Sequence, residues 1–579
     1  QGNNLSASIK KQIEDLNLPG IEFSESNSRY YPLGDFCSYI VGYAKSYEDQ
    51  SIKKMVGEMG LELSYDKTLK GKNGYKVYQT DANGYALVDG TLREKDPTNG
   101  QDIYLTIDSG LQRDLDYLMS SAYNESGAQV VTAGVMEIKT GRILAMSTYP
   151  SFNPNERNIS TFNNYFLEGT IECGSVFKPF IYADSIEEGK YDHNAYYNSG
   201  MYNVYYGNKL VATIKDHNGG EGWGSITYDQ GLYHSSNVAI CNLLDKGYVT
   251  KEVLTEKLND LGFFQGDTMD GLTCSSSINA YTRNSAGKLE YLTTGFGQGS
   301  TVTPYQLLKA YSVFGNGGKT VQPHVVEKVV DPDINKVTYQ ATTQYSKQIF
   351  SENTVKEVRD LMLGVIEDQQ GTGKNYRLDN GVRMIGKTGT GQVVENGGYS
   401  TSVYMHSFVG LAPYEDPQVV MFITFKSGDS YAQYMPNIVK QTMTSALQVV
   451  NQYNATDEKT IDESYTLDSY TNQSVNYVKS KLESKSLNVQ VIGNGGSVIE
   501  QYPLARSKVT SGDKVFIKTE GTDITLPDLT GWSKKEVQTY ASLAEIQLVI
   551  EGTSGHVTSQ SIEANQVIHK GDSLSITLS

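Results

Sequence analysis

The sequence has few cysteines, and it lacks the residue spacings that are typical of metal sites. Four cysteines are scattered over 579 residues without a C-x-x-C pair, and seven histidines lie singly, with no H-E-x-x-H motif. A zinc site or a metalloprotease would show such spacings. We therefore expect free or partly buried thiols, and a disulfide or metal role is the less favoured alternative.

Long apolar runs and an excess of basic residues are also missing. No stretch of 18 apolar residues occurs, so no segment is expected to span a membrane. The sequence begins with Gln1 and shows no signal-peptide pattern, so either the protein is soluble or an export segment precedes these residues. Lys+Arg 49 against Asp+Glu 66 gives a net charge of −17, and no basic stripe with interleaved aromatics is present. Both features argue against nucleic acid as a partner.

Length and composition indicate a multidomain globular protein. A chain of this size is too long for one core, and its length predicts about three to five domains. Residues 1–100 alternate short apolar runs with Gly, Asn and Asp turns, which predicts a strand-rich unit with a short helix over 46–59. Helices followed by late strands over 101–453 favour a mixed α/β domain with a partly antiparallel sheet. A polar, charged linker follows at 454–462.

Hydrophobic periodicity predicts the elements of the central region. Helices are expected at 111–122, 175–188, 237–245, 251–261, 305–314, 353–367 and 435–452. Strands are expected at 102–108, 129–137, 142–147, 383–387, 402–411 and 418–425. Residues 139–141 are interpreted as a hairpin turn, and the segment 191–228, rich in Tyr, Asn and Gly, as a surface excursion.

An internal repeat occupies the C-terminal part, over 463–521 and 522–579. At a constant offset of 59, Leu487, Val489 and Val491 fall on Ile546, Leu548 and Ile550. Each copy is predicted to form one helix followed by three short strands. Neither copy contains a nucleophile beside a base, so binding or packing modules are expected.

The stretch Ile171–Phe180 contains the first candidate catalytic pair. Ser175 and Lys178 are three residues apart, so on a helix that begins near Gly174 they lie on one face. A serine hydroxyl needs a base, and a lysine serves as one only when desolvation or a nearby cation lowers its pKa. A helix start also offers free backbone N–H groups to a developing oxyanion. The same S-x-x-K spacing recurs at Ser8, Ser51, Ser285 and Ser511, where we expect solvated surface pairs.

Two further short motifs follow in order. Ser235-Ser-Asn237 lies at a predicted helix start, where a hydroxyl and an amide can relay protons and hold a peptide group; the alternative is a helix cap. Lys387-Thr-Gly-Thr390 lies on a predicted strand, where the glycine admits a substrate backbone beside a cation and hydroxyls. The alternative there is an edge strand with solvated polar residues.

Together and in this order, S-x-x-K, S-x-N and K-T-G resemble the signature of the penicilloyl-serine transferases. Further stretches narrow the resemblance to class B penicillin-binding proteins: Arg29–Pro32, Leu105–Asp108, Gly141–Met146, Gly295–Gly299 and Ser407–Pro413. The N-terminal part resembles the pedestal domain of that family, and the paired repeats resemble PASTA domains. This layout is similar to the division transpeptidases of the penicillin-binding protein 2x type in Gram-positive bacteria.

The fold that the resemblance implies is multidomain α+β. It comprises a strand-rich N-terminal pedestal, an α/β transpeptidase domain with an antiparallel sheet flanked by helices, and two small α+β PASTA repeats. The implied boundaries are 1–100 for the pedestal, 101–453 for the transpeptidase domain, 454–462 for the linker, and 463–521 and 522–579 for the repeats.

The resemblance also implies a role for each motif residue. Ser175 is the acylated nucleophile and Lys178 its general base. Ser235 passes a proton to the leaving amine, and Asn237 holds the substrate's peptide group. Lys387 keeps Lys178 neutral and attracts the substrate's terminal carboxylate.

The same strand supplies the implied substrate-binding residues. The hydroxyls of Thr388 and Thr390 bind the carboxylate, with Gly389 and Gln392 as their neighbours in the substrate-binding set. Backbone N–H groups of Ser175 and Thr390 form the oxyanion hole.

The implied substrate is a peptidoglycan stem peptide ending in D-Ala-D-Ala, and β-lactams are the implied inhibitors. The resemblance implies no metal and no organic cofactor, since fixed donors supply the electrostatic stabilisation. The implied partners are a membrane glycosyltransferase and other division proteins. The implied location is the outer face of the cell membrane at the division septum, with an N-terminal anchor outside this sequence.

Three alternatives are weighed against this reading. A β-lactamase needs a deacylating base, for which no motif is present, whereas a D,D-carboxypeptidase shares the acylation chemistry and differs in the acceptor. A catalytically weak cell-wall scaffold is disfavoured because all three motifs are intact. Gly391 stands where the family more often has alanine, which we expect to loosen the strand edge. Cys173 and the 191–228 segment match no feature of the family.

Overall fold

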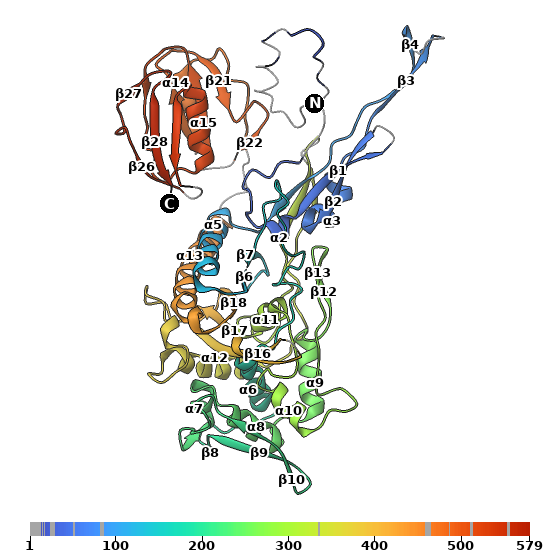
Figure 1. Ribbon diagram of the computed structural model, residues 1–579, viewed down its shortest axis with the longest axis vertical. Helices are drawn as coiled ribbons and strands as arrows, with labels where there is room; N and C mark the ends of the chain where they lie inside the picture. Colours follow the sequence, from blue (N-terminus) through green and yellow to red (C-terminus); the bar gives the residue numbers. More distant parts are fainter. Residues whose placement is uncertain are drawn as a thin grey trace. The chain divides into compact units, whose positions relative to one another are not determined.

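The protein is described by a computed structural model. The described residues are 13–578, except 14–15, 17, 22, 24–28, 50–51, 82–85, 334–335, 396, 458–464, 486, 510–512 and 553–555. The chain divides into two units, residues 1–451 and residues 452–579 (Figure 1).

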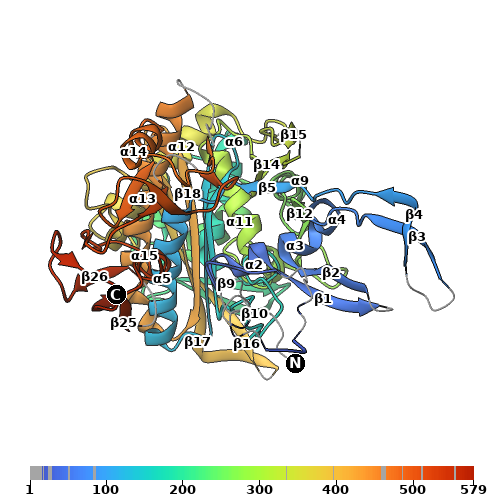
Figure 2. The same ribbon diagram turned by 90° about the horizontal axis from the view of Figure 1, so that it is seen from above.

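The N-terminal part is built from hairpins and short helices. Its elements are α2 (Ser38–Val41), β1 (Tyr43–Asp49), β2 (Ile52–Met59), α3 (Gly60–Ser64), α4 (Asp66–Leu69), β3 (Tyr75–Thr80) and β4 (Ala86–Lys95). The β3–β4 hairpin extends away from the rest of its unit in both views (Figures 1 and 2). The predicted helix over 46–59 is wrong, because β1 and β2 pair as an antiparallel hairpin there. Cross-strand pairing overrides the weak helix pattern here. Gly57 of β2 also lies directly against the Glu62 carbonyl, where a larger side chain would not fit.

The centre of this unit is an antiparallel five-stranded sheet in the order β16-β17-β18-β6-β7. Its strands are β6 (Val130–Glu137), β7 (Ile143–Tyr149), β16 (Ile385–Glu395), β17 (Gly398–Ala412) and β18 (Val419–Ser427). β16 begins later than predicted and is longer, while the β6–β7 hairpin confirms the predicted turn at 139–141. β16 is an edge strand, so one side of the K-T-G motif is not paired within the sheet.

Both faces of the sheet are covered by helices, because successive residues of its buried strands are apolar and point to opposite faces. In β18, Val420 and Phe422 pack into one core, whereas Met421 and Ile423 pack into the other. The second core includes α5 (Ser109–Ser126) and α13 (Met435–Asp457), which lie together beside the sheet in Figure 1. This arrangement confirms the expected antiparallel sheet flanked by helices.

The first core belongs to a helical region built around α6 (Lys178–Glu187), in which eight consecutive residues from Lys178 to Ser185 are buried. The surrounding helices are α7 (Tyr228–Tyr233), α8 (Asn237–Asp245), α9 (Lys251–Asp260), α10 (Lys288–Thr294), α11 (Pro304–Tyr311) and α12 (Glu352–Glu367). Of these, α8, α9, α11 and α12 confirm helices predicted from periodicity, whereas α7 and α10 correspond to no predicted helix. The 191–228 segment is more regular than expected, with β8 (Tyr196–Asn198), β9 (Met201–Tyr206), β10 (Lys209–Lys215) and β11 (Ser225–Thr227).

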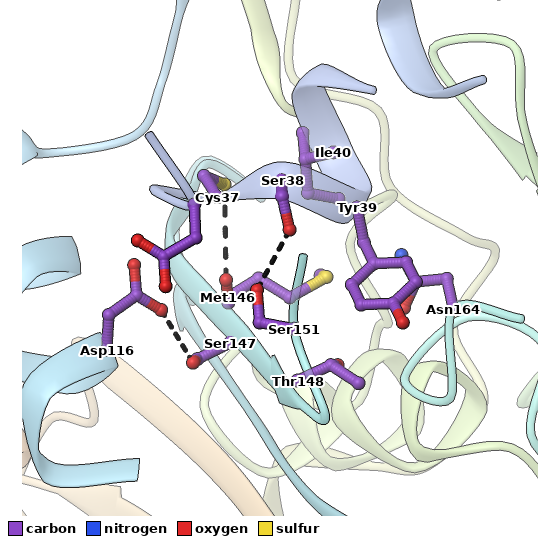
Figure 3. A pocket seen from close by; sticks show the side chains of 11 residues that line it. Cys37, Ser38, Tyr39, Ile40, Asp116, Met146, Ser147, Thr148, Ser151 and Asn164 are labelled. Carbon is purple, nitrogen blue, oxygen red and sulfur yellow. Dashed lines mark hydrogen bonds between the residues drawn. The ribbon is translucent and has the colours of Figure 1, made fainter. Parts of the chain in front are cut away.

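The N-terminal part joins the sheet through a small polar pocket between α2 and β7 (Figure 3). Ser38 Oγ lies 3.0 Å from Ser151 Oγ, and Tyr39 donates to the Pro150 carbonyl at 3.0 Å. Ser147 donates to Asp116 at 2.6 Å, and burial raises the pKa of that carboxyl to about 6. The bonds made by Ser38 and Tyr39 fix the N-terminal part to the residues that follow β7, whereas the Ser147–Asp116 bond joins β7 to α5.

The second unit contains the two predicted repeats. Each is one helix against a three-stranded sheet: α14 (Val475–Glu483) with β20 (Asn488–Ile492), β21 (Val498–Tyr502) and β23 (Lys514–Thr519), then α15 (Lys534–Ala544) with β25 (Gln547–Glu551), β26 (Val557–Gln560) and β28 (Ser573–Leu578). Phe516 meets Trp532 edge-on, with ring centroids 5.8 Å apart, so the repeats share a core. The predicted linker is partly wrong, since α13 continues to Asp457; the rest of it lies outside the described residues.

The cysteines follow the sequence expectation, because Cys37, Cys173, Cys241 and Cys274 are all buried and free. Among the described helices, none combines the length and apolar character needed to cross a bilayer.

We expect Asp184 to lower the stability of the fold at neutral pH. This α6 residue is buried, and neither of its carboxylate oxygens has a hydrogen-bond partner among the residues that the structure describes. Burial therefore raises the pKa of Asp184 well above its usual range. A group with a raised folded-state pKa favours folding most at acidic pH and loses that contribution as pH rises. Asp184→Asn is expected to raise the free energy of unfolding by about 1–3 kcal/mol at pH 8.

This gain should shrink as the pH falls below the folded-state pKa of Asp184, because the native carboxyl is then neutral too. Denaturant unfolding at several pH values measures it. Asp114→Asn, on an exposed part of α5, is the matched control and should change stability little. Equal stability of wild type and Asp184→Asn across the range would contradict the prediction.

Candidate active site

The chain folds tightly just before the first motif, and this places the candidate nucleophile. Gly174 has φ 61°, a backbone conformation that glycine adopts without strain. A 3₁₀ turn over Gly174–Phe177 then leads into α6, whose first turn contains Pro179. Ser175 is partly exposed on this turn, whereas Lys178, at the start of α6, is fully buried. The predicted helix start is confirmed.

The second motif lies between two helices. α7 ends at Tyr233, and Ser236 caps α8 by accepting a hydrogen bond from Ala239 N at 3.0 Å. Ser235 is the residue that turns the chain, with φ 58°. The cap predicted for this motif is real, but it involves Ser236, which leaves Ser235 available to the site.

Ser235 lies between two buried lysines. Lys178 Nζ donates to the Ser235 carbonyl at 2.5 Å and to Ser235 Oγ at 3.3 Å. Lys387 Nζ donates to the same Oγ at 2.8 Å and to the Thr388 carbonyl at 3.0 Å. Because both lysines occupy acceptor positions of this hydroxyl, its own proton is free to be donated elsewhere. The structure therefore brings Lys178, Ser235 and Lys387 together, as the motifs predicted.

The lysine pair supplies a base near neutral pH. Burial lowers the pKa of Lys178 to about 7, although the negative charge of Asp216 acts in the opposite direction. Burial lowers the pKa of Lys387 well below its usual range, and the positive charge of Lys178 lowers it further. Two buried amines that contact the same hydroxyl do not both hold a proton at neutral pH. An unprotonated amine is thus available one helical turn after Ser175.

The third motif packs backbone against backbone on the turn that contains Ser175. A Cβ at Gly391 would lie 1.6 Å from the Glu172 carbonyl oxygen, and a Cβ at Gly389 would lie 2.7 Å from that of Cys173. A Cβ at Gly174 would lie 2.3 Å from the Thr390 carbonyl oxygen. The expectation that Gly391 loosens the strand edge is wrong, because this glycine permits the closest approach between β16 and the turn.

The β16 residues expected to bind substrate differ in their surroundings. Thr390 is exposed, and its carbonyl faces Gly174, so its N–H, on the same side of the strand, also faces the turn with Ser175. Thr388 Oγ1 donates to Thr372 Oγ1 at 2.9 Å, so a ligand must compete for that hydroxyl. Gln392 is partly exposed further along β16, opposite Tyr404 of β17.

Sequence reasoning missed several residues that contact the motifs. Asp216 accepts hydrogen bonds from the motif around Ser235, and Asn237 Nδ2 donates to the Lys215 carbonyl at 2.8 Å. Thr372 contacts Thr388 from the loop after α12. Lys215 and Asp216 belong to the segment 191–228, and no motif in the sequence marks their contact with residues some twenty positions later.

Two absences complete the description of the site. Among the described residues, the Ser175 hydroxyl has no hydrogen-bond partner, a common state of catalytic groups without substrate. Within the same part of the chain, no group of three or more His, Cys, Asp or Glu residues is placed to hold a metal ion.

Comparisons with known proteins agree with one another. Family models match as the penicillin binding protein transpeptidase domain over 131–448, the penicillin-binding protein dimerisation domain over 2–105, and the PASTA domain over 465–521 and 524–579. Stage V sporulation protein D of Bacillus subtilis is 31% identical over 89% of this chain and 79% of its own. The peptidoglycan D,D-transpeptidase FtsI homolog of Mesostigma viride is 29% identical over 71% of this chain and 70% of its own. The crystal structure of penicillin binding protein 2X from Streptococcus thermophilus superposes with a TM-score of 0.67 at 26% identity, over 99% of this chain and 86% of that one.

Proposed function

The chain belongs to the penicillin-binding protein transpeptidase family, and on that premise we propose that it cross-links peptidoglycan stem peptides through an acyl-enzyme on Ser175. The single observation that best supports this role for the site is the position of Ser235 Oγ between Lys178 and Lys387. That arrangement provides a base, a proton relay and a cation beside the turn with the nucleophile, which are the groups that acyl transfer needs.

In the proposed first half-reaction, Ser175 Oγ attacks the carbonyl carbon of the penultimate D-Ala and its proton passes to neutral Lys178. The N–H groups of Ser175 and Thr390 stabilise the oxyanion. The proton then moves through Ser235 to the amine of the last D-Ala as the peptide C–N bond breaks. That D-Ala leaves, and the remaining peptide is held on Ser175 as an ester.

Substrate orientation is assigned to the third motif and to Asn237. Lys387 attracts the terminal carboxylate, and the hydroxyls of Thr388 and Thr390 bind it. Gly389 lets the substrate backbone approach, with Gln392 next along the strand, while Asn237 holds a peptide group of the substrate.

In the second half-reaction an amine of another stem peptide attacks the ester, its proton returns to Ser175, and a new peptide bond links the two strands. Attack by water instead would make the enzyme a D,D-carboxypeptidase. A catalytically weak cell-wall scaffold is the other alternative. The buried, low-pKa lysine pair favours catalysis over a scaffold, because an inert fold would not need to bury two amines.

We assign the pedestal and the two repeats to the boundaries predicted from the sequence, and we extend the end of the transpeptidase domain to Asp457, where α13 ends. We also place the enzyme on the outer face of the membrane at the division septum, with a membrane glycosyltransferase as its partner. The similarity to proteins named FtsI homolog and stage V sporulation protein D supports a role in division or in sporulation. Labelling of the native protein in growing and in sporulating cells distinguishes a role in division from a role in sporulation. If the labelled protein is found in sporulating cells alone, the assignment to the division septum is excluded.

The proposal is tested by the intact mass of the protein after incubation with benzylpenicillin. Opening of the β-lactam ring by Ser175 releases no fragment, so wild type should gain the whole mass of the drug and Ser175→Ala should gain nothing. Slow loss of the adduct would favour a transpeptidase over a β-lactamase. An adduct on Ser175→Ala, or none on wild type at high drug concentration, would refute the assignment of Ser175. Release of D-Ala with and without an acceptor amine then separates cross-linking from hydrolysis.

A further inference from the structure

Ser235 has a backbone conformation that a serine rarely adopts. Its φ of 58° lies in the left-handed region, where a side chain is crowded against the backbone. Such a conformation persists only where the surrounding structure fixes it, and residues of this kind gather at functional sites. The question is therefore which contacts keep Ser235 Oγ between the two lysines.

One segment of the chain contacts the residues on both sides of Ser235. We call residues 215–223 the clamp segment. On the preceding side, His217 Nε2 donates to the His234 carbonyl at 2.9 Å. The Trp223 ring stacks on the His234 ring, with the ring centroids 4.7 Å apart and an angle of 11° between the ring planes. On the following side, Asn237 Nδ2 donates to the Lys215 carbonyl at 2.8 Å.

Asp216 makes the largest number of these contacts. Its Oδ1 accepts from Ser236 Oγ at 2.8 Å, from Asn237 N at 2.7 Å and from Val238 N at 3.1 Å. Its Oδ2 accepts from Gly200 N at 2.8 Å, which ties the carboxylate to the start of the β9–β10 hairpin. The side chain is 1% exposed, so these bonds are sheltered from water.

The charge of Asp216 suits this position. The N–H groups of Asn237 and Val238 belong to the first turn of α8 and have no partner within the helix. An anion at a helix N-terminus also interacts favourably with the helix dipole. A carboxylate therefore fixes the start of α8, and with it the turn at Ser235, more firmly than a neutral side chain would.

We propose that Asp216 is a positioning residue of the acylation reaction, which holds Ser235 Oγ between Lys178 and Lys387 through the first turn of α8. The inference rests on the proposed function, in which Ser235 relays a proton. It gives the 191–228 segment a function that its composition did not indicate.

The same carboxylate acts on the general base through space. The groups that act electrostatically around Lys178 are Asp216, Cys241 of α8, Lys387 of β16 and His217. Asp216 raises the pKa of Lys178 against the lowering by burial. Removing its negative charge should therefore lower that pKa, so acylation should reach its plateau at a lower pH.

The experiment measures the acylation rate by a chromogenic cephalosporin as a function of pH in wild type, Asp216→Asn, Asp216→Glu and Ser236→Ala. In Asp216→Asn, the amide N–H would face the Gly200 N–H, and two donors cannot form a hydrogen bond. We therefore expect acylation to be about 10- to 100-fold slower. The substitution should also move the midpoint of the pH profile to lower pH. Asp216→Glu and Ser236→Ala disturb the contact with the first turn of α8, so they should slow acylation. Both variants keep the negative charge near Lys178, so the midpoint of the pH profile should not move.

A wild-type acylation rate for Asp216→Asn would overturn the proposal. A slower rate with an unmoved midpoint of the pH profile would also overturn it, because that is the result expected if Asp216 has a merely structural role. If Asp216→Asn does not fold, wild-type rates in both Asp216→Glu and Ser236→Ala would overturn it instead. Failure of the proposed function would look different, since wild type itself would then form no adduct on Ser175.

Discussion

Replacing Lys178 with methionine is expected to slow acylation of Ser175 about 10²- to 10⁴-fold, the usual contribution of a general base. Methionine has a similar length and no basic nitrogen, so the proton of Ser175 would have no acceptor at this position. In wild type, acylation should increase as pH rises through about 7, because only the unprotonated amine accepts a proton and the pKa of Lys178 is near that value. The variant should lose this dependence. Stopped-flow acylation by a chromogenic cephalosporin measures both effects.

The stability of the variant separates chemistry from folding. Lys178 is fully buried beside Lys387, so removing one amine relieves desolvation and repulsion but also removes the hydrogen bond to the Ser235 carbonyl. These effects oppose each other, so the variant should still fold. Lys178→Arg is the matched control, since arginine keeps a positive charge but does not lose its proton near pH 7. The Lys178→Arg variant should acylate as slowly as Lys178→Met. A Lys178→Met enzyme that keeps a tenth or more of the wild-type rate would exclude Lys178 as the base.

The local part of this site was predictable from the sequence. S-x-x-K, S-x-N and K-T-G each encode a short-range geometry: a helix start, a capped turn and a strand next to a glycine. Through the family resemblance, their joint occurrence also predicted that Lys178, Ser235 and Lys387 act in one site, and the structure places these three residues in contact. The 59-residue offset predicted two repeats for the same reason, since a helix and three short strands recur locally.

The long-range part was not predictable in this way. The hairpin at 43–59 depends on cross-strand pairing that periodicity does not record, so it was misread as a helix. Asp216 contacts Ser236 and Asn237 because the β9–β10 hairpin folds back onto α8, and nothing in its neighbouring residues signals that contact. Composition described this segment as a surface excursion, whereas packing makes part of it the support of the second motif.

Gly391→Ala is expected to reduce acylation about 100-fold, since a displacement of about 1 Å near the reacting groups costs that much. A Cβ at this position would lie 1.6 Å from the Glu172 carbonyl oxygen, so β16 or the turn before Ser175 must move apart. The movement would carry the Thr390 N–H away from the nucleophile, and overpacking should also lower the free energy of unfolding by about 1–3 kcal/mol. Gly398→Ala, on the paired strand, is the matched control. Apart from its chain neighbours, no atom of the described residues lies within 4 Å of its new Cβ, so both properties should be unchanged. If Gly391→Ala acylates as fast as Gly398→Ala, the turn yields to the extra methyl group without cost, and the close contact with β16 does not set the geometry of the oxyanion hole.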